Sequence, residues 1–328
     1  MNQPAQPPTQ AGPADAPRPL LGPWQVAAAY CVLLVGFALI GFASQGADVV
    51  AGLWITEALA IALPAVIWLR SAGVRPAGYF GLGAPTWRWV AIAVVTAVLN
   101  QPIVALLEQL AHSTLPAAWV LTFDQYTANL EAIFRQRAVG MTLTVVIAAP
   151  LGEELFFRGF ALPALARRRA LAAALVSGAL FSLMHFNGVG FLGLWEIGVW
   201  LAVLRWGSGS LWTAVLGHAL NNAIAAGSFL AGLQDPSEPP PLWVLASGAA
   251  LLLAGSVLGV KVLRAATPVA AVEERVAAEA PAAKAPGQEA GAGPAVDHAR
   301  SLALWLVWAI ACGAGLWQLA GTLLRARR

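Results

Sequence analysis

Long apolar runs separated by short polar segments dominate the pattern of this 328-residue chain. A helix needs roughly 20 mostly apolar residues to cross a bilayer. Several runs reach that length, and the two short runs at 170–187 and 191–206 leave room for one broken or deeply tilted span. The pattern predicts an all-α, polytopic transmembrane helix bundle of about eight or nine spans. The predicted spans are 24–44, 49–69, 89–111, 139–162, 170–187, 191–206, 210–232, 242–263 and 302–323.

Composition supports the membrane assignment. Hydrophobic residues make up 59% of the chain and charged residues 11%, whereas soluble proteins carry about 25% charged residues. An ordinary cytosolic enzyme, a nucleic-acid-binding module and a disulfide scaffold are therefore excluded. The formal net charge of +3 is too small to indicate a nucleic-acid partner. The two cysteines, Cys31 and Cys312, both lie in apolar runs.

Two segments differ from the apolar runs. Residues 1–23 are rich in Pro, Ala, Gln and Gly and predict a disordered tail. The segment 265–300, rich in Ala, Pro, Gly and Glu, predicts a flexible linker.

Basic residues indicate how the spans are oriented, because cytoplasmic loops carry an excess of Lys and Arg. Alternate predicted loops are basic, which predicts a cytoplasmic N-terminus for a multi-pass protein of the plasma membrane. The basic residues of the third-to-fourth loop and of the C-terminus do not follow this alternation. The residues that follow it are Arg70, Arg75, Arg88, Arg167–Arg169, Arg205, Lys261 and Arg264, and those that do not are Arg135, Arg137, Arg325, Arg327 and Arg328.

One predicted span contains two adjacent carboxylates and an arginine: Glu153, Glu154 and Arg158. An ionisable side chain at the bilayer centre costs at least ~2.5–3.5 kcal/mol, so each one requires an explanation. Glu154 and Arg158 are four residues apart and can form an ion pair that fixes helix packing. Glu153 points about 100° away around the helix and needs a separate partner.

Polar residues in two later spans complete the set of candidates. His185 ends the pattern Phe181-x-x-x-His185, and His218 and Asn222 share one face of a helix because they are four residues apart. Helix rise places Glu153 and His185 at similar distances, about 22 Å and 25 Å, from a hairpin turn near Arg168. Hydrogen bonding between helices is the structural alternative for both histidines and for Asn222.

These residue types suit hydrolysis. Glu153 could activate water as a general base, and His185 could hold that water or bind a metal. His218 and Asn222 could bind a metal or stabilise an oxyanion. No serine, cysteine or aspartate stands in a comparable arrangement, and the chain has no His-Glu-x-x-His zinc helix.

The three motifs, in this order on successive spans, resemble those of the CPBP family of intramembrane proteases, which includes CAAX prenyl endopeptidases and bacterial Abi proteins linked to bacteriocin processing or immunity. The resemblance covers about 139–230. It implies an endopeptidase that acts on a peptide or a prenylated protein near the cytoplasmic face, among membrane lipids. It also implies that Glu153 and His185 activate water, that His218 and Asn222 bind a metal or stabilise the oxyanion, and that Glu154 and Arg158 support them.

The residues leave the metal open. Glu153, His185 and His218 could be three zinc ligands with water as the fourth, or the same groups could act without metal. The resemblance favours zinc and a metalloprotease. With the apolar runs on either side of it, the resemblance divides the chain into N-terminal transmembrane helices (24–138), a catalytic transmembrane core (139–232), an additional transmembrane helix (233–264) and, after the linker, a C-terminal transmembrane helix (301–328).

Two other functions remain compatible with the residues. A membrane scaffold or immunity protein without enzymatic activity would retain the buried polar cluster for packing. A proton-coupled transporter would use the carboxylates and histidines as a proton relay, but we see no internal repeat in the sequence.

Overall fold

The computed structural model describes residues 21–166, 169–233, 239–265 and 294–326, which form helices and, within these ranges, no strand. The predicted all-α class is therefore confirmed. The predicted tail, up to residue 20, and most of the predicted linker lie outside the described residues. The helices are α1 (Pro23–Ala47), α2 (Val49–Ile55), η2 (Thr56–Ala62), α3 (Leu63–Ser71), α4 (Pro76–Phe80), α5 (Trp87–Thr114), α6 (Ala117–Gln136), α7 (Ala138–Leu143), η3 (Thr144–Ala148), α8 (Ala149–Glu154), η4 (Leu155–Ala161), α9 (Leu162–Leu165), α10 (Ala170–Met184), α11 (Phe191–Ser208), α12 (Leu211–Leu230), α13 (Leu242–Ala265) and α15 (Pro294–Ala326).

Helix length and apolarity make this a multi-pass membrane protein. Within the described residues, six helical stretches are long and apolar enough to cross a bilayer, and α10 is a shorter apolar helix. Helix α15 starts at Pro294, before the predicted end of the linker. The six stretches are Pro23–Ala47, Val49–Ser71, Trp87–Thr114, Ala138–Leu165, Leu242–Ala265 and Arg300–Thr322.

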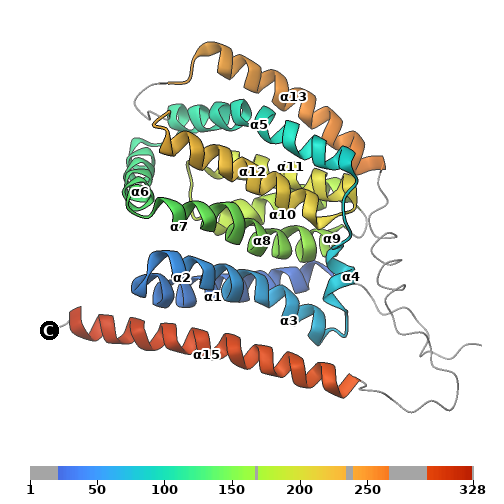
Figure 1. Ribbon diagram of the computed structural model, residues 1–328, viewed down its shortest axis with the longest axis vertical. Helices are drawn as coiled ribbons and strands as arrows, with labels where there is room; N and C mark the ends of the chain where they lie inside the picture. Colours follow the sequence, from blue (N-terminus) through green and yellow to red (C-terminus); the bar gives the residue numbers. More distant parts are fainter. Residues whose placement is uncertain (1–20, 167–168, 234–238, 266–293, 327–328) are drawn as a thin grey trace, which may run out of the picture.

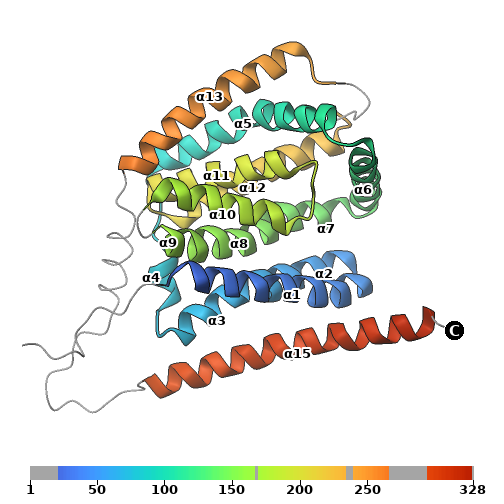
Figure 2. The same cartoon turned by 180° about the vertical axis from the view of Figure 1, so that it is seen from behind.

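The helices stack in layers, as Figures 1 and 2 show from opposite sides. Helices α5 and α13 pack together along one side, and α15 packs on α1 and α3 along the other. Between them lie α10, α11, α12 and the continuous stretch from α7 to α9. That stretch contacts η2 on one side and α12 on the other, so the predicted catalytic span lies inside the bundle.

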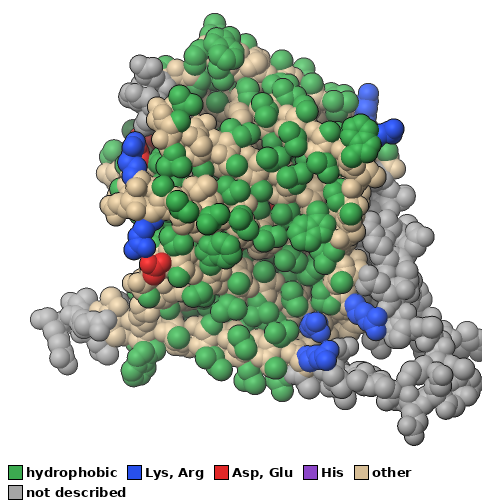
Figure 3. Space-filling model, viewed as in Figure 1, with side chains coloured by type: hydrophobic (Ala, Val, Ile, Leu, Met, Phe, Trp, Pro, Cys, Tyr) green, Lys and Arg blue, Asp and Glu red, His purple; other side chains and the backbone are tan. Residues whose placement is uncertain are grey.

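The outer surface is apolar between two charged ends. In Figure 3 hydrophobic side chains spread over the face of the bundle, and Lys, Arg, Asp and Glu gather at its edges. Large exposed hydrophobic side chains include Val98, Leu258, Ile310 and Trp317. This distribution suits helices whose outer faces meet lipid.

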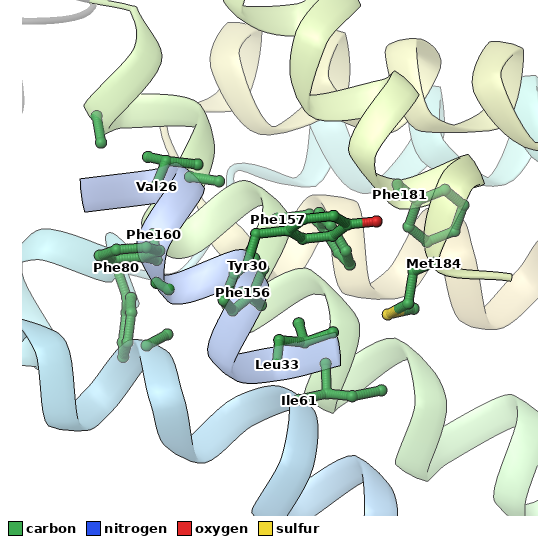
Figure 4. Packing of buried hydrophobic residues seen from close by; sticks show 14 of the residues in the cluster. Val26, Tyr30, Leu33, Ile61, Phe80, Phe156, Phe157, Phe160, Phe181 and Met184 are labelled. Carbon is green, nitrogen blue, oxygen red and sulfur yellow. The ribbon is translucent and has the colours of Figure 1, made fainter. Parts of the chain in front are cut away.

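Aromatic side chains fill the core next to the predicted catalytic span. Phe156, Phe157 and Phe160 are fully buried and pack with Tyr30 of α1, as Figure 4 shows. The Tyr30 hydroxyl donates to the Leu180 carbonyl at 2.9 Å, which ties α1 to α10. This core holds the helix that carries the two carboxylates against its neighbours.

Glycines allow α10 and α11 to approach closely. A Cβ added at Gly198 would lie 2.6 Å from the Gly178 Cα, so the two backbones meet there. Small residues commonly bring membrane helices this close. With 15 residues, α10 is about 22 Å long, shorter than the roughly 30 Å hydrocarbon core. Helix α10 by itself is therefore too short to cross the hydrocarbon core in a straight line.

Candidate active site

Glu153 and Glu154 occupy the end of α8, directly before the π-helical segment η4. Both are buried, Glu154 completely and Glu153 to 5% exposure. Single π turns inside α-helices are frequent at functional sites because they change the direction of the side chains that follow. Here the stretch that carries both carboxylates stays helical while its side chains reach more than one neighbouring helix.

Arg158 neutralises the more deeply buried carboxylate. Its Nη1 atom lies 2.7 Å from Glu154 Oε1, so the predicted pair is present, and both side chains are fully buried. Its Nη2 atom donates to the Gly198 carbonyl at 2.9 Å. The guanidinium also lies 4.6 Å from the centroid of the Phe181 ring, within cation–π range. Arg158 therefore joins η4, α10 and α11.

His218 contacts both carboxylates from α12. Its Nδ1 atom lies 3.0 Å from Glu154 Oε1, and its Nε2 atom lies 3.8 Å from Glu153 Oε2. The first distance is a hydrogen bond and the second is longer than one. Although Glu153 and Glu154 leave their helix in different directions, one imidazole reaches both.

His185 approaches Glu153 from the other side. Its Nε2 atom lies 3.9 Å from Glu153 Oε1, and its Nδ1 atom lies 2.8 Å from the Phe181 carbonyl. The residue follows the last residue of α10, and Phe186 then adopts a left-handed backbone conformation (φ 50°) that turns the chain. The His185 side chain is 31% exposed, so this edge of the cluster opens outward.

Both imidazoles have their ring nitrogens in defined roles. A carbonyl oxygen only accepts, so Nδ1 of His185 carries the hydrogen that it shares with Phe181. The Glu154 carboxylate, paired with Arg158, likewise accepts from Nδ1 of His218. In the neutral form of each ring, the Nε2 atom that faces Glu153 therefore has a free lone pair.

Asn222 lies one helical turn from His218 but outside this contact set. Its Nδ2 atom donates to the Val145 carbonyl in η3 at 2.7 Å. Its Oδ1 atom lies 3.5 Å from Asn221 Nδ2. The structure therefore places Asn222 on the predicted face of α12, with its amide oriented by neighbours.

A third carboxylate lies close to the pair, and the sequence did not single it out. Glu57 of η2 is buried, and its carboxyl interacts electrostatically with Glu153. A Cβ added at Gly152 would lie 2.6 Å from Glu57 Oε2. An ionisable residue inside an apolar span could have pointed to Glu57. Its proximity to Glu153 could not be predicted, because the two residues are far apart in the sequence.

The residues predicted to bind zinc face each other but are too far apart to form a metal site. Within the part of the chain that the structure describes, no three His, Cys, Asp or Glu side chains lie close enough together to hold a metal ion. The donor types and the hydrogen-bonded Nδ1 atoms are those that zinc ligands commonly have. The spacing of Glu153, His185 and His218 does not fit an ion as they stand.

Comparison with protein families identifies the stretch that carries these contacts. Residues 135–224 match the family described as Type II CAAX prenyl endopeptidase Rce1-like. These residues therefore form a domain similar to the CPBP/CAAX proteases. No curated protein and no solved structure matches the chain.

The matched domain assigns a general activity to the chain. It is an intramembrane endopeptidase, and its substrate is a peptide or protein that it meets in a membrane. The matched residues span α7 to most of α12, together with the end of α6, and include all six candidate site residues. The family match, like the site contacts, thus centres on the middle of the bundle.

Proposed function

We propose that this CAAX-type protein hydrolyses a peptide bond near the cytoplasmic membrane face, with Glu153 as the general base that activates water. The observation that carries the proposal is the position of Glu153 between two imidazoles, whose Nε2 atoms lie 3.8 Å and 3.9 Å from its carboxyl oxygens. Both distances exceed a direct hydrogen bond and suit contacts bridged by water.

The attacking water would bind between Glu153 and His185. Each offers an acceptor, so the water donates one hydrogen to the carboxylate and the other to Nε2 of His185. Its oxygen lone pair then faces the carbonyl carbon of the substrate. Glu153 takes a proton as the carbon–oxygen bond forms, and that proton later passes to the amine that leaves.

His218 and Asn222 would stabilise the oxyanion that forms on the substrate carbonyl. When His218 is protonated, it donates from Nε2 while Glu154 accepts from Nδ1, so the Glu154 carboxylate stabilises the imidazolium. Asn222 contributes an amide hydrogen from the next turn of α12. Arg158 pairs with Glu154 and holds its carboxyl in place.

The family suggests the substrate and the bundle suggests where it is cut. A prenylated chain would enter from lipid, since CAAX prenyl endopeptidases act on prenylated peptides. Counting along the helix, Glu153 lies about 18 Å from Leu165, at the end of the bundle where the basic residues gather. The excess of Lys and Arg supports a cytoplasmic position for that end.

Replacement of the base tests the proposal directly. Glu153→Gln should lower the kcat for a prenylated CAAX peptide by at least about 100-fold, because an amide cannot take the proton. The variant should elute from size exclusion and unfold like the parent, since the side chain keeps its shape. The matched control, Glu196→Gln, changes another glutamate inside the bundle and should retain cleavage. Full turnover by Glu153→Gln would reject Glu153 as the base.

Zinc assistance is a second form of the same hydrolysis. Glu153, His185 and His218 would have to move together to hold the ion, which would supply a bound water of lowered pKa. Metal analysis of the purified protein before and after chelation distinguishes the forms. Cleavage that survives the loss of zinc supports Glu153 acting without metal, and cleavage that returns only with zinc supports the metal form.

A further inference from the structure

A chain of three amides runs from the outer helix α5 to the site. Gln101 of α5 donates from Nε2 to Asn221 Oδ1 at 3.0 Å. Asn221 Nδ2 lies 3.5 Å from Asn222 Oδ1, and Asn222 Nδ2 donates to the Val145 carbonyl at 2.7 Å. Asn221 is buried, with 7% exposure, so water does not compete freely for its amide.

Two backbone carbonyls determine which way each of the three amide groups points. Gln101 Nε2 also donates to the Ala97 carbonyl at 3.0 Å, so both of its hydrogens are used and its nitrogen must face Asn221. Asn221 then presents its oxygen to Gln101 and its nitrogen to Asn222. At the far end the Val145 carbonyl accepts from Asn222, which agrees with the same direction.

The direction determines which group Asn222 offers to the site. An amide that turns its oxygen toward Asn221 keeps its NH₂ group on the opposite side. One of these two hydrogens bonds the Val145 carbonyl, and the other remains for a developing oxyanion. An inverted amide would offer an oxygen instead, which repels an oxyanion.

We propose that Gln101 and Asn221 are positioning residues that hold the Asn222 amide with its NH₂ group toward the reacting carbonyl. This inference rests on the proposed role of Asn222. Gln101 lies outside the stretch 135–224 that matches the family, so this helix of the bundle contributes to the orientation of a site residue on α12.

Cleavage kinetics with a prenylated CAAX peptide test this amide relay, by which we mean the hydrogen bonds from Gln101 through Asn221 to Asn222. Gln101→Met, which keeps the side-chain length, should lower kcat by about tenfold and leave KM unchanged, since Asn222 then samples both amide orientations. In an Asn222→Ala background the same change should alter kcat by less than about twofold. Asn100→Leu is the control: it removes a buried amide from the same turn of α5 and should leave kcat within about twofold of the parent, whatever it does to stability.

The outcomes separate the relay from the hydrolysis that it serves. If Asn222→Ala lowers kcat but Gln101→Met does not, the relay is wrong and the role of Asn222 stands. An equal loss from Gln101→Met in both backgrounds also overturns the relay, because the effect then bypasses Asn222. If Asn222→Ala itself retains full kcat, the oxyanion role and the relay both fail, whereas Glu153→Gln still reports on the base.

Discussion

At the scale of single residues, the cost of burying charge explains why the polar side chains depend on each other. Glu154 and Arg158 are both fully buried, and an isolated charge at that depth would be very unfavourable. Arg158 and His218 both bond the Oε1 atom of Glu154, so this carboxyl joins the cation to the imidazole. The cluster is therefore a connected set in which loss of one partner exposes the others to the full cost of desolvation.

Arg158→Met provides the matching stability prediction. Because it leaves Glu154 buried without its cation, the free energy of unfolding should fall by about 3–5 kcal/mol. Thermal or denaturant unfolding in detergent micelles measures the change. The control is Arg135→Met, which breaks the exposed pair with Glu131 and should cost less than about 1 kcal/mol. Equal stability of the two variants would contradict the assigned role of Arg158.

At the scale of elements, the π-helical segments and close helix contacts determine which residues meet. Segment η3 presents the Val145 carbonyl to Asn222, and η4 presents the Phe157 carbonyl to Ser177 at 3.0 Å. Polar side chains that bond backbone carbonyls in this way allow membrane helices to depart from α geometry. Segment η2 brings Glu57 against α8, where Gly152 leaves room for it.

Gly152→Ala tests that close approach. The added Cβ would lie 2.6 Å from Glu57 Oε2 and 2.9 Å from the Glu57 carbonyl oxygen, and the backbone atom cannot rotate away. We expect a loss of about 1–3 kcal/mol in stability, measured by thermal unfolding, and a lower kcat because α8 must shift. Gly227→Ala, also in a helix, meets no atom within 4 Å and should be neutral or slightly stabilising. An unchanged Tm for Gly152→Ala would show that η2 and α8 do not meet so closely.

At the scale of the whole molecule, charge differs between the two ends of the bundle. One end, formed by α4, the α9–α10 and α11–α12 connections and the end of α13, is basic, and the other carries charges of both signs. Helix α15 runs parallel to α1, since Gly36 and Gly46 lie beside Trp308 and Gln318 in the same order. Charged residues at the basic end include Arg70, Arg75, Arg88, Arg169, Lys261 and Arg264, and those at the other end include Asp48, Asp124, Glu131, Arg135 and Arg137.

This asymmetry predicts the topology. In a variant without Cys31 and Cys312, a cysteine at Ser113 should react with a membrane-impermeant reagent added to intact cells. A cysteine at Gly83, where a Cβ meets no atom within 4 Å, should react only after the membrane is permeabilised. Basic loops stay in the cytoplasm, which is the physical reason for the difference. The reverse pattern of labelling would contradict the predicted cytoplasmic N-terminus.

Much of this protein could be predicted from the order of its residues. Apolar runs predicted the helices, because a backbone in lipid must satisfy its own hydrogen bonds. The spacing of Glu154 and Arg158 predicted their ion pair, since four residues complete about one helical turn. Ionisable residues inside apolar spans, such as Glu153 and His218, indicated the candidate site. Their side chains are costly to bury in hydrocarbon unless they have polar partners or a function.

Only the tertiary structure decided which side chains from distant segments meet. Glu57 lies near Glu153, and Gln101 bonds Asn221, although about a hundred residues separate each pair along the chain. Such contacts depend on helix rotation, π turns and glycines that allow close approach, which no local pattern records. The sequence by itself therefore determined which groups need a polar partner, and the packing of the bundle decided which partner each one has.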